Sequence, residues 1–326
     1  MDGNAAAGAV GTGYEGTQAR SSMTRLFGGA PWRRRSERPP LDVRWWGLYF
    51  VLPVVVFFAV FSVFPVFFGF YLSLTDYDLL SPPLFVGLDN FRNLFGDKLF
   101  LTALVNTLVF VVGATVPVWA ASLAAALLFD QMFRGRNIVK AIFFLPVLPP
   151  AVVIAVIWRL LLHPNGIATS SVGWFNGISE IPWLANTVLA PLAMIIVHDW
   201  AAIPFFMLIW LAGLAGIPQE ARDAAAVDGA GALQRFWYID LPLLRPTSLL
   251  VASLSTINAF QSFVLQFVLS SDQGGPANST LVLGLLVFKS GFQYFRMGDA
   301  AAVSVVMFAM IMSVTLLQLW LGRRVY

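Results

Sequence analysis

Hydrophobic residues fall along this chain in six long blocks, separated by shorter segments that carry most of the charged residues, prolines and glycines. A helix needs roughly 20 apolar residues to cross the hydrocarbon core of a bilayer, and each block is long enough to do so. The pattern therefore predicts an all-α membrane protein with six spans. We place them at residues 46–70, 101–129, 138–162, 187–211, 249–269 and 300–321.

The third of these blocks contains three prolines, Pro146, Pro149 and Pro150. Proline removes a helix hydrogen bond and leaves backbone groups that only neighbouring protein can satisfy inside a membrane. We therefore expect this span to be kinked and packed within a bundle.

Before the first block, residues 1–44 are rich in Gly, Ala, Ser and Arg and show no apolar periodicity. This composition predicts a disordered basic tail, followed by a membrane domain over residues 45–326. The apolar block after the tail is too long for a signal peptide. The arginines next to the first span indicate topology rather than a nucleic-acid site.

The loops alternate in charge. Basic residues gather in the tail, in residues 134–140, in residues 213–245 and at Arg323 and Arg324, whereas the other loops hold few. Loops rich in Lys and Arg stay on the cytoplasmic side of a membrane. Six spans then place both termini in the cytoplasm of a multi-pass inner-membrane protein.

Composition narrows the function. The chain is 58% hydrophobic and 11% charged, with a mean hydropathy of +0.77, which excludes an ordinary soluble domain. It has no cysteine and two histidines, so we expect no metal site and no thiol nucleophile. Asp199 is the only carboxylate well inside a predicted span, which argues against a membrane-embedded enzyme with a catalytic centre. The sequence has no phosphate loop of the G-x-x-x-x-G-K-[ST] type.

The most informative polar segment covers residues 217–242. Pro218 suits a first helical turn, and Glu220 and Asp223 place negative charge near the start of that helix, where the helix dipole favours it. Alanines follow until Asp228-Gly229, where glycine can end the helix in a left-handed conformation. A second amphipathic stretch leads to Leu241-Pro242. We predict a helix–turn–helix outside the bilayer, and composition alone also allows an ordinary interfacial loop helix.

This segment resembles the EAA loop of ABC importer permeases. The family pattern is E-A-A, three residues, G, nine residues, then I-x-L-P; here it is Asp223-Ala224-Ala225, Gly229 and Ile239-Asp240-Leu241-Pro242. Asp223 departs from the usual Glu by one methylene. The chain is also similar to maltose-type and glycerol-phosphate-type permeases at residues 85–91, 143–146, 211–214 and 274–276. Importers of this kind have two permease subunits, and residues 85–91 resemble the corresponding stretch of the first of the two.

The resemblance implies a permease subunit with a six-helix bundle and a cytoplasmic coupling helix. It implies import of a sugar, a di- or oligosaccharide, with a second permease as heterodimer partner, an ATPase dimer that holds ATP and Mg²⁺, and an extracytoplasmic binding protein. This chain would itself bind no cofactor. The coupling residues implied are Glu220, Asp223, Ala224, Ala225, Asp228, Gly229, Leu241 and Pro242. A permease for glycerol phosphate or another small polar solute, and a secondary transporter, remain alternatives.

Polar residues inside spans suggest a substrate path. The fifth span carries Asn258, Gln261 and Ser262 beside the aromatic rings of Phe260 and Phe263, and sugars bind through hydrogen bonds and aromatic faces. Buried amides that join helices are the competing interpretation.

The fourth span adds the second group of candidates, His198, Asp199 and Trp200. Adjacent residues do not face each other on a helix, so we expect a polar wall or gate here rather than a proton relay, with simple packing as the alternative.

Overall fold

The computed structural model describes residues 41–131, 135–167, 171, 181–270 and 274–323. Internal contacts divide the chain into two units, one ending at Val60 and the other beginning at Phe61. The predicted disorder of the N-terminal tail falls on residues 1–40, outside the described part. Helix α2 (Leu41–Phe58) already begins at Leu41, so residues 41–44, predicted to belong to the tail, are helical.

The first predicted span is helical throughout. After α2 come a π-helical turn η1 (Ala59–Val63) and α3 (Phe64–Leu72). Residues Gly47–Leu72 form a 26-residue segment with a mean hydropathy of 2.7. Beyond Phe61, α3 packs on the last helix through an edge-to-face contact of Phe70 with Phe308, whose ring centroids lie 5.9 Å apart.

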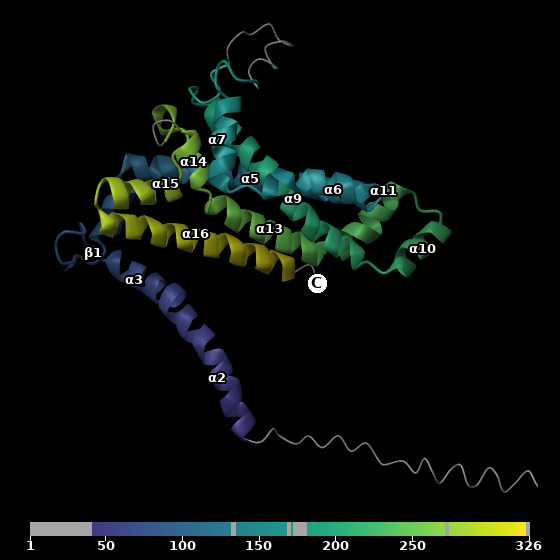
Figure 1. Cartoon of the computed structure of the whole chain (residues 1–326), viewed down its shortest axis with the longest axis horizontal. Coiled ribbons are helices and arrows are strands. Elements are labelled where there is room, and N and C mark those ends of the chain that lie inside the picture. The colour runs from purple at the N-terminus through teal and green to yellow at the C-terminus, as the bar shows by residue number, and fades with distance from the viewer. Residues whose placement is uncertain (1–40, 132–134, 168–170, 172–180, 271–273, 324–326) are drawn as a thin grey trace, which may run out of the picture. The chain divides into compact units, whose positions relative to one another are not determined.

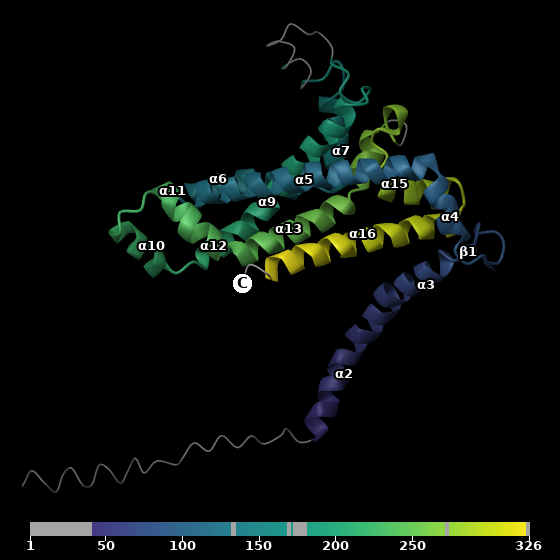
Figure 2. The same ribbon diagram turned by 180° about the vertical axis from the view of Figure 1, so that it is seen from behind.

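Four helices of the second unit run side by side, as both views show (Figures 1 and 2). These are α5 (Lys98–Asp130), α9 (Leu189–Ala215), α13 (Arg245–Phe260) and α16 (Met297–Arg323). Asp97 caps α5 by accepting a 2.9 Å hydrogen bond from the Leu99 amide. The long apolar blocks at 101–129 and 300–321 are thus confirmed as continuous helices, and the block at 187–211 is a continuous helix from Leu189 onward.

The bundle core forms two apolar clusters along these helices. One surrounds the first half of α5 and includes Phe110, and the other surrounds its second half and includes Trp210. Trp210 is fully buried and donates its indole N–H to Ser122 Oγ at 3.1 Å. Small residues allow close approach: a Cβ on Gly213 of α9 would lie 2.8 Å from Thr247 Cγ2 of α13.

The third predicted span is broken, as its prolines predict. Helix α6 (Arg136–Phe144) passes through a 3₁₀ turn η2 (Leu145–Val147) and gives way to α7 (Ala151–Leu161), and the two halves are bent by 90°. Figure 1 shows α6 along the bundle and α7 turning away from it. The expected kink is confirmed, and it is sharp enough to be either a broken span or a re-entrant loop.

The fifth predicted span differs from the prediction. Helix α13 ends at Phe260, and after a three-residue break a short helix α14 (Val264–Leu269) follows. Among the described residues, four helices are long and apolar enough to cross a membrane, or up to five if the bent pair is one span. Helix α13 has only 16 residues, fewer than the roughly 20 that a helix needs to cross the hydrocarbon core. The described residues therefore do not reproduce the predicted count of six continuous spans.

The two ends of the bundle carry different elements. At one end lie the short strands β1 (Thr75–Asp76) and β2 (Leu84–Phe85), which pair with Thr75 opposite Phe85. The same end holds α4 (Asp89–Gly96), η4 (Pro276–Asn278), α15 (Leu283–Phe288) and the π-helix η5 (Lys289–Gln293). At the other end lie α10 (Gln219–Val227), α11 (Ala232–Arg235), the π-helix η3 (Phe236–Asp240) and α12 (Leu241–Leu243), as Figure 2 shows.

Candidate functional site

The segment 217–242 has the predicted helix–turn–helix form. Helix α10 ends in a Schellman motif, in which the Ala230 amide donates to the Ala225 carbonyl at 2.9 Å and the Gly229 amide donates to the Ala226 carbonyl at 3.1 Å. Gly229 has φ = 77°, a left-handed conformation that glycine adopts without steric cost. The glycine thus ends the helix and turns the chain into α11.

Helix α10 presents one side to solvent. Four of the predicted coupling residues before the turn are exposed, namely Glu220, Asp223, Ala224 and Asp228, and so is Gly229. Ala225 is only 6% exposed, because it lies on the side of α10 that also carries the half-buried Ala221 and Arg222. Ala225 is therefore not part of the exposed surface of α10. Leu241 and Pro242 are half-buried.

Four large apolar side chains in and after α10 are also exposed, and they were not among the predicted coupling residues. Val227, Leu233, Trp237 and Tyr238 are 87%, 71%, 57% and 81% exposed. A hollow of about 320 Å³ lies beside the turn, lined by Gly229 and Tyr238 among others. Exposed large apolar side chains are a feature of interaction sites. The amphipathic period of residues 233–239 was the available signal.

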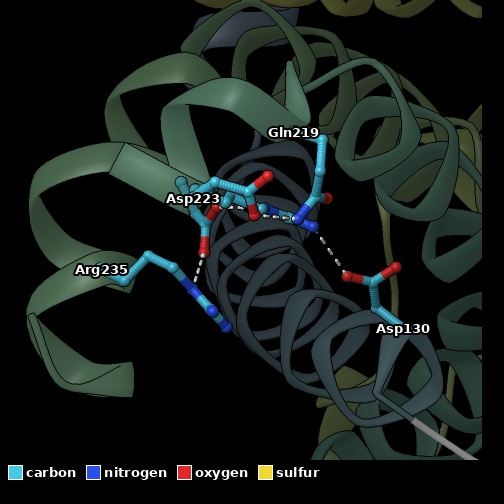
Figure 3. A network of polar contacts seen from close by, with 6 residues as sticks. Asp130, Gln219, Asp223 and Arg235 are labelled. Carbon is cyan, nitrogen blue, oxygen red and sulfur yellow. Dashed lines mark hydrogen bonds and ion pairs between the residues drawn. The ribbon is translucent and has the colours of Figure 1, made fainter. Parts of the chain in front are cut away.

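A second missed feature is an ion-pair network behind α10 (Figure 3). Arg222 Nε lies 2.9 Å from Asp240 Oδ1 of η3, and Arg222 Nη1 lies 3.4 Å from Asp130 Oδ2 at the end of α5. Arg235 Nε approaches Asp240 Oδ2 at 3.7 Å. On the outer side of α10, Gln219 Nε2 donates to Asp223 Oδ1 at 2.8 Å. Sequence spacing gave no sign that residue 130 would meet residue 222.

A cavity of about 470 Å³ lies between α9, the break after α13 and the bend between α6 and α7. Five of the predicted substrate-path residues line it: His198, Asn258, Gln261, Ser262 and Phe263. The prolines of the bend, Pro146 and Pro149, line it too. From the sequence these prolines predicted only a kink. They bring a span that is distant in sequence to the same cavity.

His198 connects the helices around this cavity. Its Nε2 lies 3.1 Å from Asn258 Oδ1 on α13, and its Nδ1 lies 3.1 Å from Asp199 Oδ1. The expectation that the adjacent residues His198 and Asp199 do not face each other is wrong, because their side chains are in hydrogen-bond contact. The ring also makes an edge contact with Phe110 of α5, at 5.4 Å between centroids.

Three predicted residues do not line the cavity. Phe260 is 2% exposed and belongs to the apolar core. Asp199 is 8% exposed. Trp200 packs edge-to-face against Trp158 of α7, at 5.4 Å between ring centroids. The helix period directs the side chains at positions 199, 200 and 260 away from the cavity that His198 and Asn258 line, while Asp199 still reaches the His198 ring beside it.

Gln266 of α14 contacts the lining residue Ser262 but does not itself line the cavity. Its side chain is fully buried, and its Oε1 accepts a 3.1 Å hydrogen bond from Ser262 Oγ. Ser262 and Gln266 therefore form a continuous polar edge at the break. In the described part of the chain, no group of three or more His, Asp or Glu side chains is arranged to hold a metal ion.

Comparison with known proteins identifies the family. Residues 113–326 match the model of the binding-protein-dependent transport system inner membrane component. This match includes α10, the Gly229 turn and every element around the cavity. The chain belongs to this family and is a permease subunit of an ABC importer.

Individual relatives agree. The chain is 34% identical to a probable ABC transporter permease, YesP, of Bacillus subtilis, over 83% of this chain and 88% of the relative. It is 32% identical to the trehalose/maltose permease MalF of Thermococcus litoralis, over 85% and 93% of the two chains. A bacterial alginate ABC transporter, solved with a periplasmic protein that holds an alginate pentasaccharide, has the same fold at a TM-score of 0.76 and 22% identity, with 89% of this chain and 98% of that chain covered.

Proposed function

We propose that this chain imports a sugar, a di- or oligosaccharide, as one of two permease subunits of an ATP-driven, binding-protein-dependent transporter. The observation that carries the proposal is the cavity of about 470 Å³, which joins amide and hydroxyl groups from Asn258, Gln261 and Ser262 with the ring of Phe263. Sugars bind where hydrogen-bonding groups surround an apolar face. The relative named for trehalose and maltose transport supports the same substrate class.

The charges around the cavity argue against glycerol phosphate. Phosphate recognition in proteins relies on Arg, Lys or helix N-termini. Among the described residues that line the cavity there is no Lys or Arg, and His198 is paired with Asp199, so the N-termini of α7 at Ala151 and of α14 at Val264 are the remaining groups of that lining that favour an anion. A neutral polyhydroxylated solute fits this lining better than an anion.

The energy for transport comes from a separate ATPase dimer in this proposal, which binds ATP and Mg²⁺. This chain contains no phosphate loop of its own. Its docking surface for the ATPase is the exposed side of α10 and the Gly229 turn, with Glu220, Asp223, Ala224 and Asp228. The exposed Val227 and Tyr238 add apolar contact area.

The remaining partners follow from the two ends of the bundle. The end with α10 faces the cytoplasm in this proposal, together with both termini, because basic residues gather in the loops of that end. The β1 end then faces outward and receives the extracytoplasmic binding protein. The second permease completes the path beside the cavity, and transport proceeds by alternating access, in which ATP binding shifts a two-state equilibrium.

The test is transport by a reconstituted complex. This chain, its partner permease and the ATPase are placed in liposomes with the binding protein, and uptake of radiolabelled maltose, maltotriose, trehalose, lactose and glycerol 3-phosphate is compared. We expect uptake of at least one sugar that requires both ATP and the binding protein. Uptake by the permeases alone under a proton gradient, or uptake of glycerol 3-phosphate without any sugar, would contradict the proposal.

A further inference from the structure

Arg222 lies on the inner side of the helix that carries the docking surface, and it contacts two other elements. Its Nε is 2.9 Å from Asp240 on η3, and its Nη1 is 3.4 Å from Asp130, the last residue of α5. The Arg222 side chain is 16% exposed and that of Asp240 is 5% exposed. Figure 3 shows Asp130 and Arg235 on opposite sides of this network.

The chemistry of arginine suits this position. A guanidinium carries five N–H donors in a rigid plane, so one side chain can hold two carboxylates in fixed directions, whereas a lysine ammonium acts as a single point charge. A second arginine, Arg235, approaches the buried Asp240 carboxylate at 3.7 Å. A buried carboxylate that loses its partner is left with an uncompensated charge, so the network favours one arrangement of α10 relative to η3.

Both elements that Arg222 holds lead to the substrate cavity. Helix α5 is an uninterrupted helix of 33 residues, about 50 Å long at ~1.5 Å per residue. Along its length Phe110 contacts the ring of His198, which lines the cavity. In the other direction, η3 continues through α12 into α13, which carries Asn258.

We propose that Arg222 is a positioning residue that clamps the docking helix α10 to the end of α5 and to η3, so that movement of the ATPase is transmitted to the cavity. The inference rests on the proposed function. It separates two tasks: the outer side of α10 binds the ATPase, and the inner side, through Arg222, Asp130 and Asp240, transmits its motion. A physical connection between two sites carries coupling when rigid elements join them.

The absence of cysteine from the sequence offers a direct test. A single reporter, Gln261→Cys, places a thiol in the cavity lining. The full complex is assembled, and the rate at which a methanethiosulfonate reagent labels this chain is measured with and without ATP and vanadate. Co-purification of the ATPase is measured on the same samples. In the reporter chain we expect nucleotide to change the labelling rate.

The decisive variant is Asp130→Asn, which removes the charge of the α5 contact at a side chain that is 34% exposed. We expect the ATPase to co-purify undiminished while the nucleotide-dependent change in labelling falls about twofold to tenfold, within the range for residues that modulate coupling. Asp130→Glu keeps the charge and should restore most of the response. Arg222→Lys should lie between them, because one ammonium cannot reproduce both contacts.

The matched control is Ser313→Ala, which removes a side-chain hydrogen bond to the Ala309 carbonyl on the exposed side of α16, away from the docking surface, the Arg222 contacts and the cavity lining. It should leave the labelling response intact. An unchanged response in Asp130→Asn with the ATPase still bound would overturn the clamp and leave the proposed function standing. Failure of the ATPase to bind the reporter chain at all would instead overturn the proposed function.

Discussion

The imidazole Nε2 of His198 on α9 lies 3.1 Å from the amide oxygen of Asn258 on α13, at the wall of the cavity. Two helices from different parts of the chain are thus joined by one hydrogen bond next to the proposed solute. Asn258 therefore has two roles in this structure, as a polar lining residue and as a link between helices.

The first prediction separates these two roles. Asn258→Leu removes both the link and the polar lining, and we expect sugar uptake to fall about fivefold to tenfold, the equivalent of one hydrogen bond at ~1–1.5 kcal/mol. Asn258→Asp keeps an oxygen facing His198 and should retain more activity. Uptake is measured at equal membrane abundance. Leu254→Ala, one turn earlier on α13 at a side chain that is 38% exposed, is the control. Equal uptake in parent and Asn258→Leu would remove Asn258 from the path.

The second prediction contrasts two neighbours. Phe260 is 2% exposed in the core, whereas Gln261 lines the cavity. Phe260→Ala should destabilise the folded protein by about 3–5 kcal/mol, because it leaves a cavity in a packed core. Gln261→Leu should leave stability near the parental value and raise the KM for sugar uptake. Thermal unfolding in detergent measures the first effect and uptake kinetics measure the second. A large loss of stability in Gln261→Leu, together with a raised KM and parental stability in Phe260→Ala, would mean that Phe260 lines the path and Gln261 belongs to the core.

The third prediction concerns the turn at Gly229. With φ at 77°, a residue with a Cβ costs about 1–2 kcal/mol there, and Gly229→Asp also adds a carboxylate to the proposed docking surface. We expect this variant to insert normally and to lose ATPase co-purification and uptake. Gly231→Asp adds the same charge two residues later, where φ is −68°. This variant should bind the ATPase better than Gly229→Asp does. Parental binding and uptake in Gly229→Asp would show that the turn is not the coupling site.

The fourth prediction tests helix packing. A Cβ at Gly213 would lie 2.8 Å from Thr247 Cγ2, whereas a Cβ at Gly69 of α3 meets nothing within 4 Å. Gly213→Ala should therefore destabilise the bundle by about 1–3 kcal/mol, as overpacking does, and Gly69→Ala should not. The midpoint of thermal unfolding in detergent compares the two variants. Equal unfolding midpoints for Gly213→Ala and Gly69→Ala would mean that α9 and α13 can move apart at Gly213 with little loss of stability.

The fifth prediction concerns orientation. Leu80 and Tyr238 are 91% and 81% exposed at opposite ends of the bundle, and the chain has no cysteine of its own. In spheroplasts, a membrane-impermeant thiol reagent should label Leu80→Cys. The same reagent should leave Tyr238→Cys unlabelled until the membrane is permeabilised. Labelling of Tyr238→Cys from outside would reverse the proposed topology.

The sequence by itself determined the class of protein and the local form of its most informative loop. Long apolar blocks need a bilayer, and the spacing of Asp223, Gly229 and Pro242 is a local property, so the helix ending at a left-handed glycine could be predicted from residues close in sequence. The three prolines likewise predicted the break between α6 and α7. Only the tertiary structure decided which residues meet across the bundle. The contact of Arg222 with Asp130 joins positions 92 residues apart, and the burial of Ala225 and Phe260 depends on which face of each helix packs inward. Neighbouring positions on a helix point in different directions, and which of Phe260 and Gln261 faces the core and which the cavity depends on how α13 packs against the other helices, which the sequence alone does not specify.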